Sequence, residues 1–251
     1  MKARASIAAL ALAATTAATA GAAGPAPADA AAKPDGPRIR EMVVFRSGAV
    51  VSRRLRVART TVDVGGRSCV VGAATPLAAL VLAQPGRLRL RDYGSCSLRP
   101  ADAAGLFVRS IRGEANRGLN GWVYKVGRKL GTAGAADPSG PFGSRRLRSG
   151  TRVAWFYCVF EAGSCQRSLE LKVTMAGRAL SASVVGYDDA GRGAAVAGAK
   201  VVARRVGGGG GAVETDADGK AAGLVLEPGE HVVRATKPGA IRSFDARVTV
   251  R

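Results

Sequence analysis

The side chains best suited to recognition chemistry are four aromatic residues in two short runs. Trp122 and Tyr124 alternate with smaller residues in the first run, and Trp155 and Tyr157 do so in the second. Aromatic rings supply a large contact area at little cost in side-chain entropy, and Trp and Tyr add a polar group. We predict a ligand-binding surface at these four residues, with a place in the hydrophobic core as the alternative.

The groups that could catalyse a reaction or hold a metal do not combine into a site. Glu214 to Gly219 resembles the start of a calcium loop, but Val225 stands where the closing glutamate is required, so a hairpin turn is expected. His231, the single histidine, has no assignable nucleophile and is interpreted as an ordinary strand residue. Asp188 and Asp189 are adjacent, which on a strand would point them to opposite faces. We therefore predict no catalytic residue, no metal site and no enzyme.

The four cysteines indicate disulfide bonds. They are Cys69, Cys96, Cys158 and Cys165. An even number of cysteines in an exported chain is typical of disulfides, and Cys-x-x-Cys metal spacing is missing from the sequence. Three pairings are possible. The turn-like segment 161–164 favours a bond between Cys158 and Cys165, which leaves Cys69 with Cys96.

The start of the chain indicates export. Lys2 and Arg4 precede an apolar run from Ile7 to Ala23, and a tract of small residues follows at 26–32. This order is typical of a secretory signal peptide, which we assign to residues 1–32, with an alanine-rich tail as the alternative. No second apolar run of membrane-spanning length follows in the sequence. The protein is predicted to be secreted, extracellular or in the cell envelope, and not membrane-spanning after signal cleavage.

Positive charge is concentrated in the middle of the sequence. The formal net charge is +20, and residues 33–166 hold 23 basic and 8 acidic residues against 13 and 9 in residues 167–251. Dense arginine clusters occur only at 53–56 and 145–148. The excess predicts attraction to anionic cell-envelope polymers, with a merely solubilising surface as the alternative; specific nucleic-acid binding is not expected.

Strand patterns dominate the elements that must position these residues. Residues 33–38 are a short linker, and a domain at 39–166 follows, with β-rich runs at 42–45, 49–57, 60–64, 69–71, 88–91 and 106–111 and the two aromatic strands. Thr75 and Pro76 predict the start of one short helix, which Pro85 ends. From residue 167 to 251 about seven short strands separated by turns predict a β-sandwich. The fold class is therefore mainly β, with an α+β first domain.

Two family resemblances accompany these patterns. The order of strands and helix, with Gly-Trp-Val-Tyr-Lys-Val-Gly at 121–127, Gly134-Ala135, Ser149-Gly150 and Trp-Phe-Tyr at 155–157, resembles the C-terminal β-grasp-like domain of the cobalamin carriers transcobalamin and intrinsic factor. This domain also occurs in bacterial surface proteins. The turn motifs at 196–201, 215–221 and 226–232 resemble the carboxypeptidase-regulatory-like, prealbumin-like sandwich family. The second resemblance implies a spacer or adhesion module.

These expectations combine into one functional prediction. We predict a secreted, non-catalytic, envelope-associated binding or interaction protein whose partner is an anionic envelope polymer or a surface protein. The alternative is a corrinoid (cobalamin)-binding module, which the first resemblance implies. The prediction requires no cofactor; cobalamin enters only with that alternative.

Overall fold

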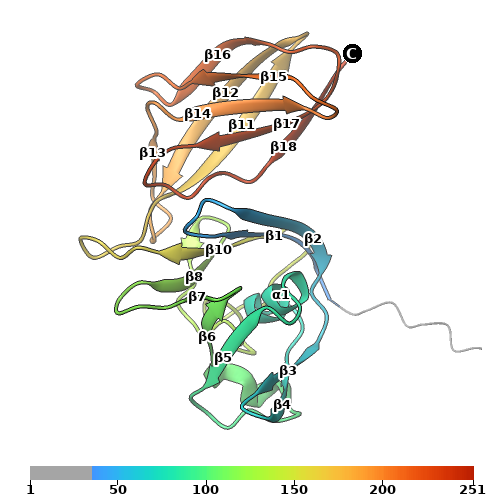
Figure 1. Ribbon diagram of the computed structural model, residues 1–251, viewed down its shortest axis with the longest axis vertical. Helices are drawn as coiled ribbons and strands as arrows, with labels where there is room; N and C mark the ends of the chain where they lie inside the picture. The colour runs from blue at the N-terminus through green and yellow to red at the C-terminus, as the bar shows by residue number, and fades with distance from the viewer. Residues whose placement is uncertain (1–35) are drawn as a thin grey trace, which may run out of the picture. The chain divides into compact units, whose positions relative to one another are not determined.

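Runs of Val, Ile, Thr and aromatic residues give this protein a mainly β fold. The computed structural model describes residues 36–251 (Figure 1), so the predicted signal peptide and residues 33–35 of the predicted linker lie outside the described residues. In the first part of the chain the elements are β1 (Arg38–Val44), β2 (Val50–Arg56), β3 (Thr60–Val64), β4 (Arg67–Val71), α1 (Pro76–Ala83), β5 (Leu88–Asp92), η1 (Pro100–Gly105), β6 (Leu106–Ile111), β7 (Glu114–Ala115), β8 (Gly121–Val126), β9 (Lys129–Leu130) and β10 (Arg152–Cys158).

One five-stranded sheet organises the first part. Its order is β2-β1-β10-β8-β9, and β1 pairs with β10 in parallel while the other pairs are antiparallel. The strands β3 and β4 form a separate hairpin, and β5, β6 and β7 form a three-stranded sheet. Alternation along β1 sends Ile39 and Val43 into one hydrophobic cluster and Met42 and Val44 into another on the opposite face. Both faces of this sheet are therefore buried along part of their length.

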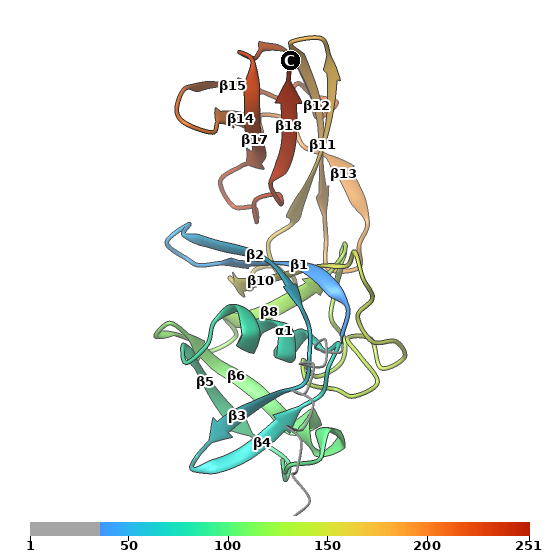
Figure 2. The same ribbon diagram turned by 90° about the vertical axis from the view of Figure 1, so that its right-hand side faces the viewer.

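The helix α1 packs on the sheet face that carries Ile39 and Val43. Thr75 begins it as predicted: its Oγ1 accepts a hydrogen bond from Ala78 N at 3.3 Å, and Pro76 occupies the first turn. Leu77 and Leu80 are fully buried, and α1 contacts β1, β2 and β3 (Figure 2). A short 3-10 helix, η1, begins at Pro100.

The second part of the chain contributes two further sheets. Its strands are β11 (Ser168–Ala176), β12 (Ala179–Tyr187), β13 (Gly193–Ala195), β14 (Lys200–Arg205), β15 (Gly210–Glu214), β16 (Lys220–Val225), β17 (Gly229–Thr236) and β18 (Ala246–Val250). One sheet joins β11, β12, β13 and β16, and the other has the order β15-β14-β17-β18. Both contribute to one hydrophobic cluster that includes Leu180, Val184, Val201 and Val233. Eight strands are present where about seven were predicted, because the three-residue β13 is too short to show a pattern.

Two disulfide bonds confirm the predicted cysteine pairing. Cys69 at β4 joins Cys96, and Cys158 at the end of β10 joins Cys165. The segment inside the second bond turns at Ala162 and Gly163, which both have positive φ, and two hydrogen bonds between Glu161 and Ser164 close it. No helix within residues 36–251 has the length and apolar character needed to cross a bilayer.

Candidate functional site

The pairing of β8 with β10 brings the four predicted aromatic residues together on one face. Trp155 lies opposite Tyr124, and Tyr157 lies opposite Trp122. The Tyr124 and Trp155 rings are 5.2 Å apart, and the Trp122 and Tyr157 rings meet edge to face at 5.8 Å. All four are at least 93 % buried in the cluster that also holds α1. The rings are thus part of the hydrophobic core, and any role in binding must use the edges that remain accessible.

Three of the four aromatic residues use their polar atoms to hold neighbouring backbone. Trp122 Nε1 donates to Glu114 O at 2.7 Å, and Tyr157 Oη donates to Ala115 O at 3.1 Å, so both secure β7. Tyr124 Oη donates to Ala133 O at 2.6 Å. Burial, with a smaller contribution from Asp137, raises the pKa of Tyr124 to about 12, so its hydroxyl stays a donor at physiological pH.

Trp155 differs from the other three aromatic residues. Its side chain is 2 % exposed, and its Nε1 has no hydrogen-bond partner among residues 36–251. A buried N–H without an acceptor costs free energy. Trp155 is therefore the one member of the aromatic group with an unused polar contact.

A pocket of about 200 Å³ lies beside these rings. Its wall is apolar and comes from β6, β8, β9, β10 and the loop that follows β9. The lining residues are Leu106, Phe107, Val108, Trp122, Val123, Tyr124, Leu130, Gly131, Ala133, Gly134, Ala135 and Trp155. Since a dry apolar cavity of about 150 Å³ binds benzene, this pocket has room for one ring or a short branched acyl group.

The glycine-rich loop at 131–143 forms one wall of this pocket because it packs directly on Tyr124. A Cβ atom at Gly131 would lie 2.1 Å from the Tyr124 ring, so only glycine fits there. Thr132 N and Ala133 N both donate to Pro141 O, at 3.0 and 3.1 Å, and close the loop on itself. Ala135 O accepts from Leu77 N of α1 at 2.8 Å. These contacts fix the wall in place before any ligand arrives.

Phe107 is the most exposed ring that lines the pocket. It is 43 % exposed and packs edge to face on Tyr93, with ring centroids 5.9 Å apart, while its neighbours Leu106 and Val108 are buried. Sequence reasoning did not single it out. An aromatic residue at a solvent-facing position of a predicted strand was the feature of the sequence that could have indicated it.

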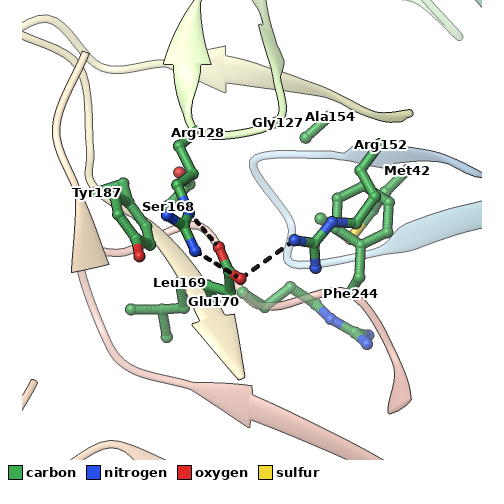
Figure 3. A pocket seen from close by; sticks show the side chains of 11 residues that line it. Met42, Gly127, Arg128, Arg152, Ala154, Ser168, Leu169, Glu170, Tyr187 and Phe244 are labelled. Atoms are coloured by element: carbon green, nitrogen blue, oxygen red, sulfur yellow. Dashed lines mark hydrogen bonds and ion pairs between the residues drawn. The ribbon is translucent and has the colours of Figure 1, made fainter. Parts of the chain in front are cut away.

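Apart from the apolar pocket, a cluster of charged residues surrounds Glu170 (Figure 3). The Glu170 carboxylate accepts from Arg128 Nε at 2.8 Å and from Arg152 Nη2 at 3.2 Å, and Arg128 also stacks 4.6 Å from the Tyr187 ring centroid. The hydrogen bonds from Arg128 and the charge of Arg152 lower the pKa of Glu170. The free space here is about 20 Å³, close to the volume one water needs. The cluster is therefore a closed contact and leaves no room for a ligand.

Lys125, which sequence reasoning also missed, is fully buried. Its Nζ donates to Tyr187 O at 2.9 Å and Asp188 O at 3.0 Å, and forms an ion pair with Asp189 at 3.4 Å. Burial lowers the pKa of Lys125, and Asp189 partly opposes that shift. A lysine on a strand is usually predicted to be exposed to solvent. Here residues 187–189 pack over the Lys125 side chain and bury it.

The remaining chemical candidates have structural roles. Asp216 Oδ1 accepts from Asp218 N and Lys220 N, both at 2.9 Å, which closes the predicted turn. His231 is 1 % exposed on β17, and its Nε2 is 2.8 Å from Glu227 O. Asp188 and Asp189 follow β12 and do not lie on a strand, so the argument that a strand would point them to opposite faces does not apply. Residues 36–251 contain no group of three or more His, Cys, Asp or Glu side chains placed to hold a metal ion.

Comparison of the chain with protein-family models and with curated proteins finds no matching family and no matching protein.

Proposed function

We propose that this chain is a secreted, non-catalytic binding protein associated with the cell envelope, and that its ligand inserts an apolar group into the pocket beside Trp155. The observation that carries the proposal is the preformed 200 Å³ pocket with Trp122, Tyr124 and Trp155 in its wall. The sequence predicted a ligand on these rings. In the structure only their edges are accessible, so we place the ligand against these edges and against Phe107.

The pocket also suggests the chemistry of the inserted group. Ligand pockets usually have volumes of about 300–1,000 Å³, so a site of this size takes one part of a ligand. Its apolar wall favours a single ring or a branched aliphatic group. Trp155 is one of the residues in this wall, and its Nε1 is unpaired among residues 36–251.

The proposed domain assignment keeps both resemblances. We assign 39–166 to a β-grasp-like domain and 167–251 to a prealbumin-like sandwich. A mixed sheet with one helix on its face supports the first assignment. Two sheets that enclose one hydrophobic cluster support the second. The two disulfides favour an oxidising compartment, in agreement with secretion.

For the corrinoid alternative, the pocket needs to hold only a part of the cobalamin molecule. A corrin ring is much larger than the space available, so cobalamin would insert only a side group here. Cobalamin therefore enters the test as one probe among several.

Fluorescence provides the test, because the only two tryptophans of the chain both line the pocket. The oxidised protein is titrated with single-ring amides, short branched acyl amides and cobalamin while the emission is recorded. We expect saturable changes with at least one probe class. In the Phe107→Ala variant the affinity for that probe should fall about tenfold, equivalent to about 1.4 kcal/mol.

Phe160→Ala is the matched control. Phe160 is 41 % exposed, close to the 43 % of Phe107, and does not line the pocket. Its variant should bind the probe as the unmodified protein does. The proposal fails if no probe changes the emission at millimolar concentration, or if the two variants lose affinity equally.

A further inference from the structure

Four arginines form two cross-strand pairs on the β1–β2 hairpin. Arg38 lies directly opposite Arg56, and Arg40 directly opposite Arg54. All four share one face, since paired residues of adjacent antiparallel strands point to the same side. Neighbours along a strand are two residues, or about 7 Å, apart, and the strands are about 4.8 Å apart. The four arginine side chains therefore start from the corners of a small rectangle on the sheet and concentrate positive charge there.

This arrangement carries a repulsion that the described residues offset only in part, through the charge of Asp245 near Arg40. Like charges directly opposite each other destabilise a strand pair. None of the four arginines forms an ion pair within residues 36–251. Burial lowers the pKa of Arg40, and the charges of Arg54 and Arg152 lower it further. Such a charge cluster favours an external anion.

Edge protection does not account for the cluster. The strand β2 is at the edge of its sheet, and charged residues there discourage pairing with another chain. That function explains Arg54 and Arg56. It does not explain Arg38 and Arg40, because β1 is an interior strand paired on both sides.

A groove of about 540 Å³ runs along the four arginines. Arg38, Arg40, Arg54 and Arg56 line it, together with Ile39, Leu55 and Gly150. The lining includes no acidic and no aromatic residue. Arg40 is partly engaged elsewhere: it donates to Asp245 O and lies 5.6 Å from the Phe244 ring. Arg56 donates to Gly36 O at 3.0 Å, and the exposed side chains of Arg38 and Arg54 remain open to solvent.

We propose that this groove binds a linear phosphodiester polymer that carries no bases. Guanidinium groups match the geometry of phosphate oxygens, and the spacing of about 7 Å along β1 and β2 suits a chain whose charges are separated by short linkers. Single-stranded nucleic acid is bound through aromatic stacking platforms as well as charge, and this groove offers no such platform. The site shares no lining residue with the apolar pocket. It rests on the proposed function, for whose envelope association it names a polymer.

The test measures the affinity of the oxidised protein for a synthetic glycerol-phosphate oligomer by fluorescence anisotropy. The double variant Arg38→Gln/Arg54→Gln should bind at least tenfold more weakly, and its affinity should depend less steeply on salt. The double variant Arg87→Gln/Arg204→Gln removes the same charge from two exposed positions outside the groove and should change the affinity less than twofold.

Two outcomes would overturn the proposal. Equal losses in both double variants would mean that net charge alone drives binding. Binding of a single-stranded oligonucleotide with the same number of phosphates, as tight as that of the glycerol-phosphate oligomer, would assign the groove to nucleic acid instead. Titration of the Arg38→Gln/Arg54→Gln variant with the pocket probes separates this proposal from the proposed function, because those probes should bind it normally.

Discussion

Glu41 is the residue whose surroundings conflict most with its chemistry. It lies on β1 between Ile39 and Val43, on the face that packs against α1, and is 1 % exposed. Neither carboxylate oxygen has a hydrogen-bond partner among residues 36–251. Burial raises the pKa of Glu41 well above 4.5, and the charge of Arg53 on β2 opposes that shift only in part. The native state therefore favours the protonated form.

This pKa predicts a pH dependence of stability. In the unfolded chain Glu41 loses its proton near pH 4.5, while the native state keeps it to higher pH. The native state thus binds more protons in that window, and its free energy of unfolding falls as the pH rises from 4.5 to the native pKa. The loss should approach about 1.4 kcal/mol per pH unit for a single group.

Chemical denaturation at several pH values measures this effect. Glu41→Gln should remove the decline, because glutamine does not titrate. Glu161→Gln removes a charge from an exposed turn and should leave the decline in place. A Glu41→Gln variant with the same pH dependence as the unmodified protein would show that Glu41 is not its source.

At the scale of elements, the loop at 131–143 depends on one close approach. Gly131→Ala would push a methyl group into the Tyr124 ring, whose hydroxyl holds Ala133 O. Overpacking of this kind costs about 1–3 kcal/mol. We expect that loss in the free energy of unfolding, together with weaker binding of the pocket probes.

Gly72→Ala is the control for this substitution. A Cβ atom at Gly72 would meet Pro100 at 3.5 Å, an ordinary contact. Its variant should lose less than about 0.5 kcal/mol. If Gly131→Ala is equally well tolerated, the loop is free to move away from Tyr124, and the rigid pocket wall described above is wrong.

Local sequence signals predicted the elements well and their partners poorly. Thr75 and Pro76 give the start of α1, and alternation gives most strands, because these signals lie within a few residues. The strands β7, β9 and β13 have two or three residues, too few for a period. The common face of Trp122, Tyr124, Trp155 and Tyr157 follows from the register of β8 with β10, which no local spacing encodes.

The burial of Lys125 and Glu41 could not be predicted from the sequence either, because segments distant in the chain cause it. Lys125 alternates with Tyr124 and Val126 as a surface residue would, yet residues 187–189 cover it. Glu41 occupies an interior strand because β1 pairs on both sides. The pocket likewise needs β6, β8 and the 131–135 segment together, so the sequence predicted its aromatic residues but not its shape.

At the scale of the whole molecule, Lys125 links segments that are distant in sequence. Lys125→Ala would leave Tyr187 O and Asp188 O without their donor and Asp189 without its ion pair. Breaking a buried pair costs about 3–5 kcal/mol. We expect about 3 kcal/mol, because the Asp189 side chain is 23 % exposed.

Thermal and chemical denaturation test this prediction. Lys172→Ala removes an exposed lysine from β11 and should cost less than about 0.5 kcal/mol. Lys125→Met keeps most of the volume but not the donor, so it should also be destabilising. Unchanged stability in Lys125→Met would mean that Lys125 contributes packing alone.

The parallel pairing of β1 with β10 also fixes when the protein can fold. A ribosome releases β1 early, and its parallel partner β10 emerges only after the helix, the hairpins and the glycine-rich loop have been made. Until then Met42 and Val44 lack the cover that Ala154 and Phe156 provide. The five-stranded sheet therefore cannot close until β10 has been synthesised, which leaves the apolar side chains of β1 open to aggregation until then.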